Sequence, residues 1–309
     1  AKQIGVTHAL VKAAPELSGL AAPDDLDALR TVKERFAKEG ITLLGLEGDQ
    51  FDMSRIKRGE PGRDEDLQRY HRMLENMGEL GLTLLCYNFM PRAKTAEFDW
   101  HRTDVAVPLR GGSLTTAYDA SLAAESTELE LSHEQLWANY TYFIQSVMPV
   151  AERCGVKMGL HPDDPPLSSL GTMPRIFNCP EAWERAFELA PSICNGVTFC
   201  QANFKLMGAD SKIWVRRFVE LNKLFFVHFR DVEGSAARFT EIWHDEGDGD
   251  MGAMVRLYHE VGFDGPIRDA HVPAMHGEKP KVPGYGTLGH LFAVGYIKGL
   301  LDAQRISYT

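Results

Sequence analysis

Several features of secreted, membrane-spanning and nucleic-acid-binding proteins are missing from this sequence. Its 309 residues contain only five cysteines without regular spacing, so a disulfide framework is not expected and a reducing, cytoplasmic compartment is favoured. No uninterrupted apolar run reaches the length of a transmembrane helix, which predicts that the protein does not associate with a membrane. Basic residues are comparatively few: 33 Lys and Arg against 43 Asp and Glu give a net charge of −10, which argues against nucleic acid as a partner.

A glycine-rich dinucleotide-binding turn is also missing after the first predicted strand, which disfavours the open-sheet dinucleotide-binding proteins. Predicted strands nevertheless alternate with helices along the whole chain, and this alternation is typical of a parallel sheet with helical crossovers. Strands are expected at residues 3–7, 41–46, 82–86, 156–160, 196–200, 224–228 and 265–269. We therefore predict an α/β protein with the TIM-type (β/α)8 barrel fold, in which the remaining strand is hidden, truncated or lacking.

One domain accounts for the whole length, because a (β/α)8 barrel needs roughly 250 residues. We predict a single barrel domain over residues 1–309, interrupted by a long polar excursion at about residues 92–131. A connection of this length inside a compact domain is usually a functional loop or lid. After it, Ser132 and Gln135 predict a capping box that begins a long helix ending near Arg153.

Polar side chains stand where the predicted strands end. The strand at 156–160 is followed by His161 and a dense acidic turn, and Pro165 and Pro166 end the strand because proline cannot donate a hydrogen bond to the sheet. In a barrel, the residues that carry the chemistry gather at the carboxyl ends of the strands. The residues expected there are Glu47, Asn88, His161, Cys200, His228 and Asp269.

The imidazole, thiol and carboxylate groups among these residues predict a metal site. Each alone has a simpler explanation, since a strand-end histidine is often a hydrogen-bonded core residue and a cysteine a small buried hydrophobe. Three such residues at equivalent strand ends, His161, Cys200 and His228, make a metal the better interpretation. With a carboxylate from Asp269, this mixed site suits Mn²⁺, Fe²⁺, Co²⁺ or Zn²⁺ and is too soft for Mg²⁺ or Ca²⁺.

Eight short motifs together point to a family. They are CYNFMP (86–91), DWHRTD (99–104), HPDDPP (161–166), NGVTFC (195–200), VHFRDV (227–232), HDEGDGDM (244–251), PIRDAH (266–271) and PGYG (283–286). In these motifs and their order the chain resembles the mannonate dehydratases, metal-dependent barrel hydro-lyases of hexuronate breakdown that are related in fold to xylose-isomerase-like barrels. The resemblance also implies that the first strand of the family lies upstream of Ala1, which would explain the missing strand.

The resemblance implies metal ligands and a catalytic pair. The family's metal ligands fall on His161, Cys200 and His228, with Mn²⁺ as the first choice of metal, and its catalytic His–Tyr pair falls on His271 and Tyr285. The fourth ligand departs from the family, whose Arg-Pro-Asp-His order becomes Arg-Asp-Ala-His over residues 268–271. The aligned position is Ala270, so either Asp269 reaches the metal, or His271 or a water takes its place.

Other polar residues are candidates for binding the substrate. Arg230 and Arg268 are placed to hold a substrate carboxylate in a bidentate fork, although either is also unremarkable as a surface charge. Asp163 and Asp164 either orient His161 or simply solvate the turn. Further contacts to sugar hydroxyl groups, or to the residues that bind them, are assigned to Glu47, Asn88, Arg102, Asp104 and His244.

The leading hypothesis is therefore a hydro-lyase that dehydrates D-mannonate or a similar aldonate to a 2-keto-3-deoxy acid. The alternative within enzymes is a metal-dependent sugar isomerase or epimerase of the same barrel superfamily, which the change at Asp269 and Ala270 keeps open. A non-catalytic sugar-binding protein is the third hypothesis. The expected partner is a small sugar acid, and we expect the chain to form a homo-oligomer, either a dimer or a tetramer.

Overall fold

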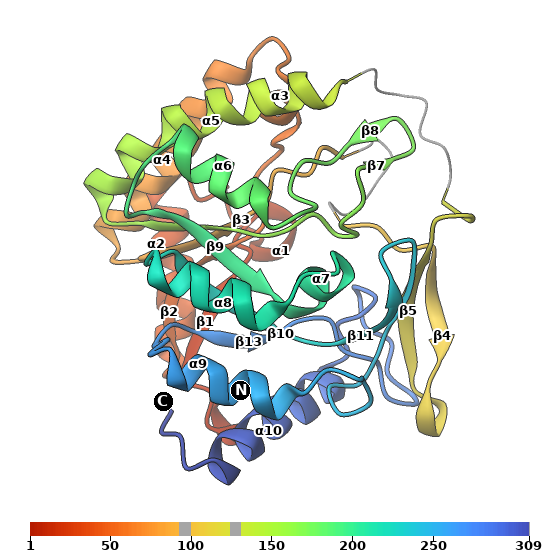
Figure 1. The fold of residues 1–309 in the computed structure, drawn as a ribbon. Helices are drawn as coiled ribbons and strands as arrows, with labels where there is room; N and C mark the ends of the chain where they lie inside the picture. Colours follow the sequence, from red (N-terminus) through yellow and green to blue (C-terminus); the bar gives the residue numbers. More distant parts are fainter. Residues whose placement is uncertain (93–99, 124–130, 309) are drawn as a thin grey trace.

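A seven-stranded parallel sheet forms the centre of the molecule (Figure 1). The structure is a computed structural model that describes residues 1–92, 100–123 and 131–308. Neighbouring strands pair in parallel and in chain order, as expected for helical crossovers, and the α/β prediction is confirmed. In order, the strands are β1 (His8–Val11), β2 (Thr42–Glu47), β3 (Leu84–Tyr87), β6 (Lys157–Leu160), β9 (Asn195–Cys200), β10 (Leu224–Phe229) and β13 (Ile267–Asp269).

Amphipathic helices connect these strands and bury one face each against the sheet. In α2, Asp25 caps the first turn by accepting from the Ala28 amide, and Leu29 and Val32 are buried one turn apart. The longer helices are α2 (Leu26–Lys38), α4 (Arg63–Glu79), α5 (His133–Cys154), α6 (Glu181–Leu189), α8 (Ser211–Glu220), α9 (Met251–Glu260) and α10 (Thr287–Ala303). Short helices are α1 (Pro15–Ser18), α3 (Ser54–Arg58) and α7 (Gln201–Leu206), with 3-10 turns at Lys2–Ile4 and Arg110–Gly112.

The first strand was predicted too early in the chain. Residues Lys2–Ile4 form a 3-10 turn that ends at Gly5, whose φ of 75° is a left-handed conformation that turns the chain. Strand β1 begins only at His8, where it pairs with Thr42 of β2. The apolar residues at the start of the chain are too few to show where the strand begins. The start of β1 depends instead on its pairing with β2.

The excursion at residues 92–131 contains strands where a loop was predicted. Its described part carries β4 (Asp104–Pro108) and β5 (Leu114–Asp119), which join β11 (Val232–Ser235) and β12 (Arg238–Glu241) in an antiparallel sheet ordered β11-β12-β5-β4. This sheet stands at the side of the molecule toward which the parallel strands point (Figure 1). Because β5 pairs with β12, more than a hundred residues away along the chain, local periodicity gave no sign of it. Residues 93–99 and 124–130 of the predicted lid lie outside the described residues.

The main core lies between the parallel sheet and its helices. Aromatic rings dominate one part of it, where Phe177 packs against Tyr140 with ring centroids 4.8 Å apart and against Trp183 at 5.6 Å. A two-stranded ribbon, β7 (Ser169–Leu170) and β8 (Met173–Pro174), lies beyond β6. Among the described residues, every helix is too short or too polar to cross a lipid bilayer.

The capping box of α5 yields a stability prediction. Ser132 Oγ accepts from the Gln135 amide, and the Gln135 side chain accepts from the Ser132 amide, as the sequence predicted. Ser132→Ala should lower the free energy of unfolding by about 1 kcal/mol, because a donor at the helix start loses its partner. Urea denaturation measures the change. The control is Ser211→Ala, the first residue of α8 behind its Asp210 cap, which should change stability by less than about 0.5 kcal/mol.

Candidate active site

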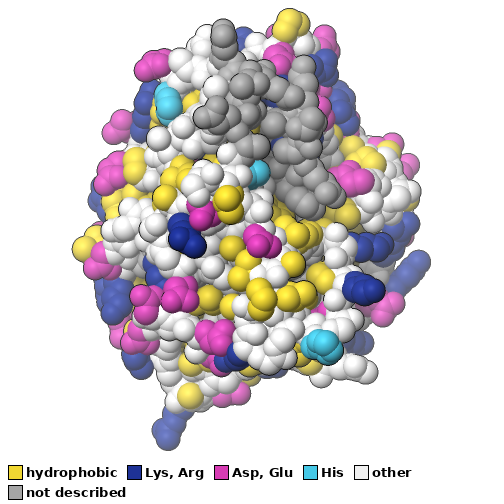
Figure 2. All heavy atoms as spheres, turned by 90° about the vertical axis from the view of Figure 1, so that its right-hand side faces the viewer, with side chains coloured by type: hydrophobic (Ala, Val, Ile, Leu, Met, Phe, Trp, Pro, Cys, Tyr) yellow, Lys and Arg dark blue, Asp and Glu magenta, His cyan; other side chains and the backbone are white. Residues whose placement is uncertain are grey.

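A cavity of about 990 Å³ opens at the carboxyl ends of the parallel strands. Figure 2 faces this side of the molecule, where hydrophobic side chains gather in the middle with acidic side chains beside them. Because parallel strands end at one edge of the sheet, the residues that follow them meet around this cavity. Nine of the residues singled out in the sequence line it: Glu47, Asn88, His161, Asp164, His228, Arg230, Arg268, His271 and Tyr285.

Three predicted metal ligands come together at the base of this site. The donor atoms of His161, Cys200 and His228 all lie within 4.8 Å of one another. They stand at the ends of β6, β9 and β10, which are consecutive strands of the sheet. His161 Nδ1 lies 2.7 Å from the Pro162 carbonyl oxygen. A proton on Nδ1 would make that bond and leave the Nε2 lone pair available to a metal.

The protonation states of the two imidazoles also suit metal binding. Burial lowers the pKa of His161 and lowers that of His228 further, so both imidazoles are neutral near pH 7 and present a lone pair. Burial raises the pKa of the Cys200 thiol, and the Arg230 guanidinium, whose Nε donates to Sγ at 3.3 Å, opposes this effect. His228 Nε2 is buried without a hydrogen-bond partner among the described residues. Two nitrogens and a sulfur with such an unused lone pair fit a transition-metal ion.

Two other groups of potential ligands lie nearby. Glu47, Cys86 and His228 also have donor atoms within 4.8 Å of one another, so His228 belongs to both sets. Glu47 Oε1 lies 3.4 Å from His228 Nε2 and 3.0 Å from an Arg268 nitrogen. Asp164, Glu241 and His271 form the third group, but arginines already hold both of its carboxylates.

Those arginines and carboxylates form a buried charge network beside the metal-binding candidates. Arg102 donates to Asp164 through two bonds of 2.8 and 3.1 Å and also donates to Glu241. Arg230 donates to the same two carboxylates, with 2.9 Å to Asp164. The guanidinium groups hold the pKa of Asp164 and of Glu241 well below the usual values despite burial. The network is therefore ionised, and each charge has an opposite charge in contact.

Glu241 is the member of this network that the sequence analysis missed. It is the last residue of β12, the second strand of a hairpin, and none of the motifs includes it. The only sign in the sequence is a carboxylate between the apolar residues Phe239 and Ile242. Glu241 Oε1 also lies 3.0 Å from Nδ1 of His271 and so orients that ring.

The predicted catalytic pair is brought together at the cavity wall. The rings of His271 and Tyr285 lie 5.2 Å apart at a steep angle, and Trp100 covers His271 at 5.0 Å. Burial lowers the pKa of His271 to about 4, with Arg230 adding to the effect and Glu241 opposing it, so the ring is neutral near pH 7. Burial raises the pKa of Tyr285, although Arg268 opposes the rise, so the phenol keeps its proton.

Asp269 does not point to the metal-binding candidates. Its Oδ2 accepts from His290 Nδ1 of α10 at 2.6 Å, and it belongs to none of the ligand groups found among the described residues. Successive residues of a strand point in opposite directions, so the shift of the carboxylate by one position turns it toward the helix. Ala270, only 2% exposed, lines the cavity in its place. The geometry therefore gives no support to Asp269 as fourth ligand.

Three further residues from the sequence analysis have structural partners away from the cavity. His244 Nε2 lies 2.7 Å from the Phe229 carbonyl, and Asp104 lies on the exposed strand β4, where it accepts from the Ala106 amide. Asp163 accepts from the Phe177 amide at 2.7 Å, and burial raises its pKa to about 6. These residues shape the loops around the site.

Lys57 is a second residue that the sequence did not reveal. It lies on the short helix α3, outside all of the motifs, and its side chain is only 2% exposed. Its ammonium donates to Asp49 at 2.6 Å and to the Asn88 side-chain oxygen at 2.9 Å, so it brings a positive charge to the cavity wall.

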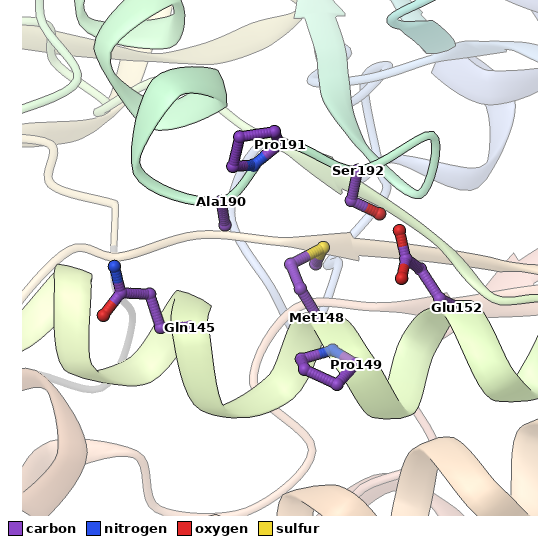
Figure 3. Close-up of a pocket in the computed structure, with 7 residues that line it drawn as sticks. All are labelled: Gln145, Met148, Pro149, Glu152, Ala190, Pro191 and Ser192. Carbon is purple, nitrogen blue, oxygen red and sulfur yellow. The ribbon is translucent and has the colours of Figure 1, made fainter.

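A smaller depression of about 170 Å³ lies elsewhere, between α5 and the segment before β9 (Figure 3). Its seven lining residues include the single carboxylate of Glu152 and neither imidazole nor thiol. The chemistry is therefore concentrated in the large cavity.

The buried charge network predicts that loss of one of its carboxylates destabilises the protein more than loss of an exposed carboxylate. Glu241→Gln should destabilise the protein by roughly 3–5 kcal/mol, because it leaves buried guanidinium charge under-compensated. Glu260→Gln, which removes the partner of the half-exposed Arg216, is the matched control and should cost at most about 1 kcal/mol. Chemical denaturation of both variants measures the difference, and equal losses would contradict the role of the network.

Comparisons with known proteins identify the family. The family model for D-mannonate dehydratase (UxuA) matches residues 22–134 and 126–308. The mannonate dehydratase of Streptococcus pneumoniae (strain 70585) is 33% identical over 345 aligned residues, covering 98% of the chain and 92% of that relative. The crystal structure of mannonate dehydratase from Streptococcus suis serotype 2 superimposes with a TM-score of 0.88 at 32% identity, covering 100% of the chain and 92% of that structure.

More distant structures confirm the fold class. A xylose isomerase-like TIM barrel protein from Mycobacterium smegmatis aligns with a TM-score of 0.59 at 14% identity, covering 98% of the chain and 86% of that structure. Solved sugar epimerases resemble the chain at only 11–13% identity, a likeness of fold alone. The chain therefore belongs to the D-mannonate dehydratase family, with the xylose-isomerase-like TIM-barrel fold, and is a lyase that removes water from a sugar acid.

Proposed function

We propose that this chain dehydrates D-mannonate, or a closely similar aldonate, to a 2-keto-3-deoxy acid with the help of a divalent metal. The observation that carries the proposal is the convergence of His161, Cys200 and His228, whose donor atoms lie within 4.8 Å of one another, with both histidines lining the cavity. These residues would hold the metal, with Mn²⁺ as first choice and Fe²⁺, Co²⁺ or Zn²⁺ as alternatives. Such an ion would offset the negative charge that develops on the substrate carboxylate.

Arg268 is the better of the two arginines for binding the substrate carboxylate. Arg230 already donates to Asp164, Glu241, Asn203 and Cys200, so few of its N–H groups are available to bind a substrate. The Arg268 side chain lines the cavity and is 28% exposed. Asn88, with Lys57 beside it, is placed to contact hydroxyl groups along the sugar chain. Arg102 and His244 would support the site from behind, a role the buried contacts of both residues favour.

His271 and Tyr285 would divide the proton transfers. Neutral His271, oriented by Glu241, would take the proton from the carbon next to the carboxylate. Tyr285, whose raised pKa keeps it protonated, would give a proton to the neighbouring hydroxyl, which leaves as water. The resulting enol rearranges to the 2-keto-3-deoxy acid. Overall, one water is lost and no oxidant or reductant is needed.

We also propose that the protein acts in the cytoplasm as a homo-oligomer. The five cysteines are all free, which is typical of a reducing compartment. The dimer or tetramer stays a prediction from the sequence.

Product analysis tests the substrate and the reaction. After loading with Mn²⁺, the protein should convert D-mannonate to a product that reacts as a 2-keto-3-deoxy acid, with a mass lower by one water. Formation of an isomer with unchanged mass would favour the isomerase or epimerase alternative instead. Metal binding without any product from D-mannonate would contradict the proposed substrate.

Replacement of Tyr285, the proposed general acid, tests the proton transfers in the same assay. Tyr285→Phe should lower kcat by roughly 10²–10⁴-fold, the usual contribution of a general acid. Its Mn²⁺ content should match that of the wild type, because the phenol is not among the proposed ligands. An unchanged kcat would remove Tyr285 from the proton transfers.

Loss of a proposed ligand tests the metal centre directly. His161→Ala and Cys200→Ala should each bind less than one-tenth of the wild-type metal after gel filtration, because two ligands remain from the set of three. Elemental analysis measures the bound metal. Cys154→Ala, at the end of α5, is the control and should keep the wild-type content. Normal metal in either His161→Ala or Cys200→Ala would contradict the assignment.

A further inference from the structure

The three candidate ligands lack a carboxylate, which is usual for Zn²⁺ but unusual for Mn²⁺, the first choice of metal. Imidazole and thiolate donors are intermediate or soft, whereas Mn²⁺ prefers oxygen ligands. The strand end beside them carries Ala270, which has no donor, and Asp269 is held by His290. A carboxylate for the metal must therefore come from another element.

Most carboxylates near the site are already engaged. Asp164 and Glu241 each bind both Arg102 and Arg230, and Asp163 holds the Phe177 amide. To reach a metal, any of these would have to give up buried ionic or backbone bonds.

Glu47 differs from all of them. It is the last residue of β2, and its Oε1 lies 3.4 Å from His228 Nε2, which is itself buried without a hydrogen-bond partner among the described residues. Arg268 takes Oε1 at 3.0 Å, but Oε2 is buried and has no partner in the described part of the chain. A buried carboxylate oxygen without a partner costs free energy unless a ligand satisfies it.

We infer that Glu47 supplies the carboxylate ligand of the metal centre, in place of the residue lost at position 270. This inference rests on the proposed metal-dependent function and changes the role of Glu47 from substrate binding to metal binding. Glu47 shares a ligand group with His228 but not with His161 and Cys200, so Oε2 would have to shift toward an ion held by these three residues, while Oε1 keeps its bond to Arg268. The charge of the centre would thereby be balanced from β2, across the barrel from β10.

One competing arrangement uses Glu47 differently. Because Glu47, Cys86 and His228 also form a ligand group, the ion would then lie between these three residues, away from His161 and Cys200. Glu47 would be a ligand in both arrangements, so replacing the cysteines distinguishes them. The inferred centre needs Cys200, and the competing centre needs Cys86.

The experiment measures the Mn²⁺ affinity of the metal-free 309-residue chain by calorimetry, without substrate. Glu47→Gln keeps the size of the side chain and an oxygen for Arg268 but removes the charge. Its affinity should fall at least as much as the roughly 10–100-fold typical of losing a residue that supports a ligand. Glu16→Gln, which removes a carboxylate at the exposed rim of the same cavity, is the matched control and should stay within about twofold of the wild type.

Absorption spectra of the Co²⁺-bound variants show whether a loss of affinity comes from misfolding. With saturating Co²⁺, Glu47→Gln should keep the thiolate-to-cobalt absorption contributed by Cys200 while its d–d bands shift. Cys86→Ser should keep both the absorption and the Mn²⁺ affinity.

The outcomes separate the inference from the proposed function. Unchanged Mn²⁺ affinity in Glu47→Gln overturns the inference, whatever the activity on D-mannonate. Loss of affinity in Asp269→Asn but not in Glu47→Gln, or in Cys86→Ser but not in Cys200→Ser, also overturns it. Weakened binding in Glu47→Gln together with an inactive wild type would support the ligand and contradict only the substrate.

Discussion

The site depends on two arginines and two carboxylates that are buried together. Asp164 follows β6 and Glu241 lies on β12, so Arg102 and Arg230, by binding both, tie the antiparallel sheet to the edge of the barrel. Ionised groups are costly to bury unless each is paired, and here the pairing is complete enough to keep both carboxylates charged. The same network positions His271 through Glu241, so the histidine proposed as base is held by charges that also stabilise the fold.

Parallel strand order explains why a metal centre can form beside this network. The ends of β6, β9 and β10 are neighbours, so His161, Cys200 and His228 meet although they are far apart along the chain. Burial then keeps the imidazoles neutral, which preserves the lone pairs that a metal needs. Ala270 offers no ligand atom at its strand end, whereas the buried Oε2 of Glu47 has no hydrogen-bond partner among the described residues.

Much of the fold could be predicted from local patterns, because amphipathic helices and buried strands have periods that the sequence displays. The helix cap at Ser132 and the strand before His161 are examples. The antiparallel sheet could not be predicted in this way, since β5 and β12 come from separate loops and are defined by pairing with each other. For the same reason Glu241 escaped notice, as its role comes from partners on three other segments.

By itself the sequence determined which strand ends carry imidazole, thiol and carboxylate groups, and that an alternating βα chain gathers them at one edge. It did not determine which carboxylate lies near the candidate metal ligands. Asp269 and Ala270 are adjacent in the chain but point in opposite directions, while Glu47, more than 200 residues earlier, lies 3.4 Å from His228. Only the tertiary structure decides this, because side-chain direction depends on strand register and on the partners, such as His290 and Arg268, that the fold brings close.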